Sequence, residues 1–184
     1  MPELCEEDVW ELTMVLTQYN SKAFLGTMLK ALVERLQRGT LDLHSTGGGS
    51  FLTLIASNEL DRQKTLAALL PAMKTADDVQ WLLHKTGVEE GRERMACLLR
   101  IPTMACGFVL LRTLRFVEHD RALLVRVAVF LMKRGDGLGF NLASLLRTTY
   151  GLEEVKGVFS LHIEPYQLDR LSNSYEAFSR AMKF

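Results

Sequence analysis

Cysteine is scarce in this sequence, and its scarcity excludes a disulfide-stabilised domain. The 184 residues include three cysteines, at positions 5, 97 and 106. An odd number at such wide spacing does not make a disulfide framework. We therefore interpret them as free thiols in a reducing compartment, the cytoplasm or the nucleus. The first residues, Met-Pro followed by acids, do not have the pattern of a secretory signal peptide.

Long apolar runs and an excess of one charge are also absent. No apolar run approaches the roughly 18 residues that a membrane-spanning helix needs, so we expect no membrane role. Lysine plus arginine and aspartate plus glutamate both number 22, which gives a formal net charge of zero. Taken as a whole, such a chain offers no electrostatic reason to bind nucleic acid or a membrane surface.

Proline is rare too, with four residues, and runs of β-branched residues are few. Apolar residues make up 48% of the chain, as in an ordinary globular protein, and they recur at helical spacing over most of its length. We predict an all-α fold of about nine short antiparallel helices, arranged as a helical bundle or an irregular stack. In general form such a stack resembles the armadillo and HEAT helical repeats. No internal repeat near their period of about 40 residues is present.

Two further segments affect this prediction. The clearest helical period follows Pro165 and comprises Leu168, Leu171, Tyr175, Phe178 and Met182. Residues 157–163 are the only candidate for a strand. Residues 134–139, RGDGLG, are predicted to form a loop between helices, because they lack the preceding strand and the following Lys-Ser/Thr of a phosphate-binding loop.

The stretch GGGS at residues 47–50 is the least ordinary part of the chain. Such a run is typical of a flexible coil, and it is also a repeat that protein engineers insert. We interpret it as a flexible linker of engineered origin, between a helical hairpin at 1–46 and a main helical domain at 51–184. The two pieces are then either a fused partner and its receptor, which we favour, or one protein from which a loop was removed.

The hairpin is too small to bury its own apolar stripes, so we expect it to dock on the main domain. A helix-in-groove contact usually depends on a few aromatic and large aliphatic anchors. The expected anchors in residues 1–46 are Trp10, Leu12, Leu16, Phe24 and Met28.

Catalytic and metal-binding patterns are missing from the sequence. None of the four histidines lies at helical i, i+4 spacing from another histidine or a cysteine, as a helical metal site requires. Cys97 and Cys106 lie in apolar surroundings, whereas a catalytic thiol needs a basic neighbourhood. We predict no enzymatic activity, no metal and no cofactor.

Arginine is concentrated in residues 92–147, which hold ten basic and four acidic residues. Nine of the ten are arginine, which pairs well with carboxylate and phosphate groups. Arg112, Arg115 and Arg126 are the expected contacts on this surface. A solvated face, an acidic protein partner and nucleic-acid phosphate are the three interpretations.

These observations favour a non-enzymatic protein–protein interaction module, a scaffold or adaptor subunit of an intracellular complex. Its partners would be proteins, acidic or helical in character. The alternative is a nucleic-acid-binding helical repeat that uses the Arg-rich region 92–147, whose binding would weaken steeply with salt.

Overall fold

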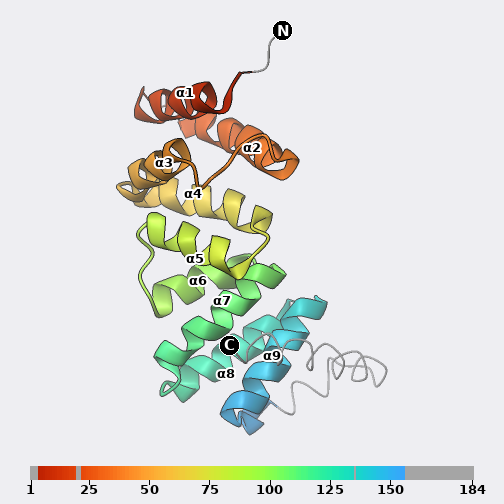
Figure 1. Ribbon diagram of the computed structural model, residues 1–184. Helices are drawn as coiled ribbons and strands as arrows, with labels where there is room; N and C mark the ends of the chain where they lie inside the picture. The colour runs from red at the N-terminus through yellow and green to blue at the C-terminus, as the bar shows by residue number, and fades with distance from the viewer. Residues whose placement is uncertain (1–3, 20–21, 135, 156–184) are drawn as a thin grey trace. The chain divides into compact units, whose positions relative to one another are not determined.

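The computed structural model describes residues 4–19, 22–134 and 136–155, and these residues form nine α-helices and no strand (Figure 1). The predicted all-α fold is therefore confirmed. The helices are α1 (Glu6–Tyr19), α2 (Lys22–Arg38), α3 (Thr46–Ala56), α4 (Glu59–Leu69), α5 (Ala76–Lys85), α6 (Arg92–Arg100), α7 (Met104–Leu114), α8 (Arg121–Lys133) and α9 (Gly137–Tyr150). Three short 3₁₀ turns follow α4, α7 and α9: η1 (Leu70–Ala72), η2 (Arg115–Val117) and η3 (Glu153–Val155).

The strand candidate at 157–163 and the helix expected after Pro165 lie outside the described residues. The last element that the structure describes before them is the 3₁₀ turn η3. Among the helices that it does describe, none is long and apolar enough to cross a membrane.

The chain divides into two compact units, which comprise residues 1–89 and residues 90–184. The boundary differs from the predicted one, because the glycine stretch lies inside the first unit. Residues 1–46 and residues 51–89 thus belong to one compact body.

The first unit is built from neighbouring helical pairs. Helix α1 lies on α3, α2 lies on α4, and α3 also contacts α5 (Figure 1, red to yellow-green). The starts of these helices follow from capping side chains: Asn58 accepts from two backbone N–H groups of α4, and Thr75 with Asp78 forms a reciprocal capping box on α5. The largest side chains of the core that are almost inaccessible are Phe51, Leu52, Ile55, Leu66, Leu69, Leu70, Leu82 and Leu83.

The second unit has the same kind of organisation. Helix α6 packs on α7, and α9 packs on both α7 and α8. Thr103, Asp120 and Asp136 cap the starts of α7, α8 and α9. Gly151 ends α9 in the left-handed conformation, with φ of 61°, which glycine adopts without strain. Its most deeply buried side chains include Leu98, Cys106, Leu110, Leu114, Leu124, Ala128, Leu131, Leu142, Ala143 and Leu146.

The flexible linker predicted at 47–50 is wrong as a description of these residues, which form the first turns of α3. The Gly48 N–H donates to the Ser45 hydroxyl oxygen at 3.3 Å, so Ser45 is the N-cap. A Cβ atom on Gly48 would lie closer than 3.0 Å to the carbonyl oxygen of Leu43. Leu43 is itself buried. The glycine therefore allows two backbone segments to touch, which is a structural role rather than that of a spacer.

The loop predicted at 134–139 is also wrong for residues 137–139, which are helical. Helix α9 already begins at Gly137, and the Gly139 N–H donates to Asp136 Oδ1 at 2.5 Å. A Cβ atom on Gly139 would lie closer than 3.0 Å to the carbonyl oxygen of Leu131. In both units, therefore, the first turn of a helix, α3 or α9, touches a preceding carbonyl group through a glycine.

Candidate interaction surfaces

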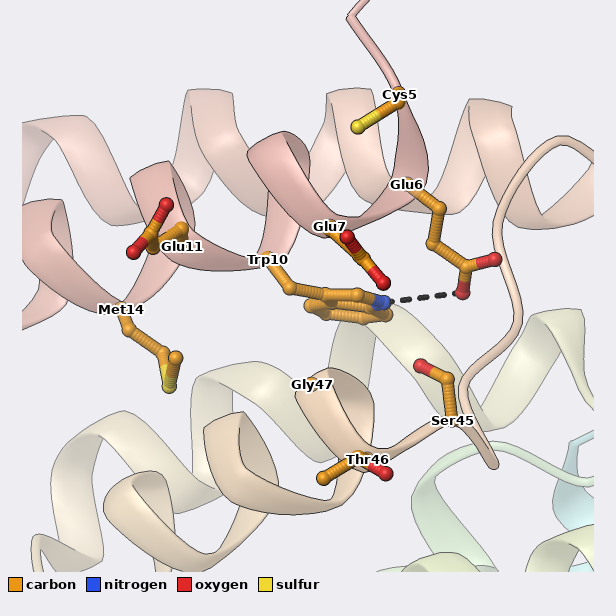
Figure 2. Close-up of a pocket in the computed structure, with 9 residues that line it drawn as sticks. All are labelled: Cys5, Glu6, Glu7, Trp10, Glu11, Met14, Ser45, Thr46 and Gly47. Atoms are coloured by element: carbon orange, nitrogen blue, oxygen red, sulfur yellow. Dashed lines mark hydrogen bonds between the residues drawn. The ribbon is translucent and has the colours of Figure 1, made fainter.

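Trp10 fixes α1 against the start of α3. Its side chain is only 2% exposed, and its ring centroid lies 5.8 Å from that of Phe51. Gly47 makes this approach possible, because a Cβ atom there would lie 2.6 Å from Trp10 Cβ. Figure 2 shows the indole lying over Gly47, with its nitrogen directed toward Glu6.

Glu6 joins three segments of the first unit. Its Oε1 accepts from the indole Nε1 of Trp10 at 3.2 Å and from the backbone N–H of Asp42 at 2.9 Å. The hydrogen bond from Asp42 is the main cause that lowers the pKa of Glu6 below its ordinary value. The ionised carboxylate therefore holds the loop before α3 against α1.

A hollow of about 690 Å³ lies beside Trp10 and is rimmed by acidic side chains. Figure 2 shows Glu7 and Glu11 on α1, with Cys5 at one edge and Met14 at the other. The Cys5 thiol donates to Asp8 Oδ2 at 3.0 Å. The described residues contain no cluster of three or more histidine, cysteine or acidic side chains arranged to hold a metal ion. The hollow is thus an acidic surface recess.

The expected anchors of the N-terminal helices separate into two groups. Trp10 and Met28 are buried, at 2% and 8% exposure, and Leu16 is half-buried. Leu12 and Phe24 are exposed, at 49% and 45%. Trp10 therefore packs against Phe51, which follows the glycine stretch, whereas Leu12 and Phe24 do not pack in this contact.

Helix α1 is apolar on a second face as well, which we call the α1 stripe. It comprises Leu12, Val15 and Tyr19, at positions i, i+3 and i+7, which are exposed by 49%, 46% and 84%. The helix buries Val9, Trp10 and Thr13 instead. We expected Leu12 and Leu16 to dock on the main domain because their spacing is also helical. The buried Thr13 beside Trp10 was the missed signal for the true inner face.

Arginines in the second unit also form two groups. Arg92, Arg121 and Arg134 pair with Asp120, Glu154 and Asp136, at 2.6, 2.6 and 3.0 Å, and Arg94 and Arg147 pair with Glu90 and Glu153. The remaining five basic side chains of region 92–147 are exposed and make no ion pair with any residue that the structure describes: Arg100, Arg112, Arg115, Arg126 and Lys133.

Of the three arginines predicted as contacts, Arg112 and Arg115 lie one turn apart where α7 passes into η2. Arg126 lies on α8, next to an apolar hollow of about 470 Å³. We call this hollow the α8 groove; its lining residues are Leu99, Leu123, Val125, Arg126, Val127, Val129, Phe130 and Lys133.

Cys106 and His44 have contacts that explain them as structural residues. Cys106 is inaccessible on α7, and burial raises the pKa of its thiol above the ordinary value. The His44 ring lies 4.1 Å from the Trp81 ring, centroid to centroid, and its Nε2 is 3.0 Å from Asp78 Oδ1. His44 therefore attaches the segment before α3 to α5.

Comparisons of the chain with protein-family models, with curated proteins and with solved structures gave no match.

Proposed function

We propose that this chain is a non-enzymatic protein–protein interaction module, a scaffold or adaptor subunit of an intracellular complex. The observation that carries the proposal is the α1 stripe, whose three large apolar side chains are about half exposed or more. Large apolar side chains that lie side by side on a protein surface are typical of an interaction site. An apolar face there favours a further protein surface as its cover.

The energy available from covering the stripe is appreciable. Burying a large apolar side chain completely contributes about 1.5–3 kcal/mol. Leu12 and Val15 are about half exposed and Tyr19 is more so. Covering all three would therefore contribute about 3–5 kcal/mol, before the entropic cost of association. That contribution suits a contact in which the stripe is one part of a larger interface.

The thiols support an intracellular location within the same proposal. No disulfide joins the three cysteines: Cys5 is exposed, Cys97 is partly exposed and Cys106 is buried. Proteins that work in the cytoplasm or the nucleus keep their thiols reduced. We therefore propose one of these compartments.

A second candidate is the nucleic-acid-binding helical repeat, which is favoured by the five basic side chains that have no ion-pair partner among the residues that the structure describes. It predicts an affinity for duplex DNA or RNA that falls steeply with salt, because binding would release counterions. Electrophoretic mobility shifts at two salt concentrations would test it.

The interaction module is tested by replacing the stripe. The variant carries Leu12→Gln, Val15→Gln and Tyr19→Gln, and a control carries Glu11→Gln and Gln18→Ala, two exposed positions of the same helix. Tagged chains are recovered from cell extract, and circular dichroism confirms that each is folded. We expect the stripe variant to lose a stoichiometric protein that wild type and control retain. An unchanged set of bound proteins contradicts the proposal.

A further inference from the structure

We propose that the α8 groove binds an acidic amphipathic helix of a partner protein. This surface belongs to the second unit and shares no residue with the α1 stripe. The inference is therefore independent of the test described for the stripe, and either can fail while the other holds.

The groove is apolar because α8 has more apolar side chains than are buried in the core of the second unit. Leu124, Val127, Ala128 and Leu131 face inward, with exposures of 3% or less. Leu123, Val125 and Val129 are partly exposed, and Phe130 is 46% exposed. Together with Leu99 at the end of α6, these side chains form a hollow whose accessible surface is mainly apolar. Such a hollow on the surface is typical of a binding groove.

Hydrogen bonds fix the wall of the groove in place. The Arg134 guanidinium donates to the carbonyl oxygens of Leu99 and Arg100 at 3.1 and 3.4 Å, and to Asp136 Oδ2 at 3.0 Å. These bonds connect the end of α6 to the end of α8. A groove that is already formed loses little conformational entropy when it binds.

Two cations mark the groove and indicate the charge of its occupant. Arg126 and Lys133 both line it, are exposed, and have no ion-pair partner among the residues that the structure describes. They are seven residues apart on α8, a separation of about 10 Å along the helix axis, with Phe130 between them. A partner helix with apolar residues on one face and two carboxylates about two turns apart matches both the floor and the cations.

Other occupants fit this chemistry less well. The chain's own residues 156–184 hold four basic and three acidic residues, so their net charge is positive and they match the two cations less well than an acidic helix does. A nucleic-acid backbone would pair with the cations but would leave the apolar floor without a partner. An acidic amphipathic helix satisfies both parts of the groove.

Fluorescence anisotropy with the full chain tests the proposal. The probe is a labelled three-turn peptide with leucines at i, i+3 and i+7 and glutamates flanking that face. A second peptide carries lysine at each glutamate position. We expect the acidic peptide to bind wild type at least about tenfold more tightly than the basic one. Phe130→Ala should weaken binding of the acidic peptide by a similar factor, because it removes the centre of the floor.

Charge reversal supplies the decisive comparison. R126E/K133E should weaken the acidic peptide about tenfold or more and strengthen the basic peptide. The matched control, R112E/R115E, removes the same charge from exposed positions outside the groove and should change the affinity less than about twofold. Equal losses in both variants would show general attraction to a basic surface and overturn the proposal, as would equal binding of both peptides.

The remaining occupants have their own outcomes, and each overturns the proposal. Light scattering that shows wild type as an oligomer and R126E/K133E as a monomer would assign the groove to a second copy. Binding of the acidic peptide only after Leu171→Ser and Phe178→Ser would assign it to the C-terminal segment. The groove would be assigned to phosphate groups if wild type bound duplex RNA or vesicles containing phosphatidylserine, R126E/K133E did not, and the acidic peptide did not bind at all.

Discussion

Gly48→Ala changes a single hydrogen into a methyl group at the contact between α3 and the preceding segment. The added Cβ would lie closer than 3.0 Å to the backbone carbonyl oxygen of Leu43. A backbone atom cannot rotate away as a side chain can, so α3 or the segment before it must shift. The neighbouring Gly49 provides a matched control, because a Cβ there meets nothing within 4 Å.

The two substitutions are expected to change stability in opposite directions. Forcing a methyl group into a packed site costs about 1–3 kcal/mol. Replacing glycine by alanine within a helix contributes about 0.5–1 kcal/mol, because alanine loses less backbone entropy on folding. Gly49→Ala should therefore stabilise the first unit by about 0.5–1 kcal/mol. Gly48→Ala should destabilise it by about 1–2 kcal/mol, the balance of the two effects.

Tryptophan fluorescence during urea unfolding measures this difference in the right part of the chain. The sequence has two tryptophans, Trp10 and Trp81, and both belong to the first unit. The midpoint should move to lower urea for Gly48→Ala and to higher urea for Gly49→Ala. If both variants raise the midpoint equally, α3 does not touch Leu43 and the glycine stretch behaves as the free linker that its composition suggests.

Three further outcomes follow from the described contacts. Glu6→Gln should reduce the stability of the first unit at neutral pH. Because the pKa of Glu6 is lowered in the folded state, its carboxylate stabilises the wild-type fold at pH values above its pKa in the unfolded chain. This stabilisation is lost as the pH falls through the pKa of the folded state, so the stabilities of the two proteins should converge in acid. Urea unfolding followed by fluorescence at several pH values would measure this. An aromatic disulfide reagent should react rapidly with exposed Cys5 and, at Cys106, only as fast as the second unit opens; rapid reaction at both would contradict the burial of Cys106. Thr75→Ala should cost about 1 kcal/mol through loss of the capping box on α5, which thermal unfolding by circular dichroism would measure, whereas no loss would mean that the cap is dispensable.

Helices and their ends could be predicted from the sequence, because caps and apolar periods are local signals. Thr75 followed by Ala-Asp-Asp has the local pattern of a helix start, and α5 begins there, just as Asp120 caps the start of α8. Trp10 was predicted as a contact across the glycine stretch, and it packs against Phe51. In each case the deciding interaction lies within a few residues or involves one large aromatic ring.

Tertiary packing decided the features that the sequence did not predict. The run of glycines at 47–49 reads as a coil when only local entropy is considered. The close approaches of Gly47 to Trp10 and of Gly48 to Leu43 explain why glycine is needed at these two positions. Helix α1 has apolar residues on two faces, one that includes Val9 and one that includes Leu12. Only the position of α3 determines that the face with Val9 is the buried one. The basic residues likewise required the structure, because pairing partners such as Asp120 for Arg92 lie 28 positions away.

The backbone contacts at Gly48 and Gly139 also limit how this chain can vary during evolution. When two side chains clash, a second substitution that makes one of them smaller can restore the fit, so such pairs change together. At these two positions the neighbour is a carbonyl oxygen, and no amino acid is smaller than glycine. A compensating change is therefore not available. In any relative that keeps this packing, both positions should remain glycine while the apolar residues around them exchange freely, which makes the pair a stringent marker for recognising distant homologues.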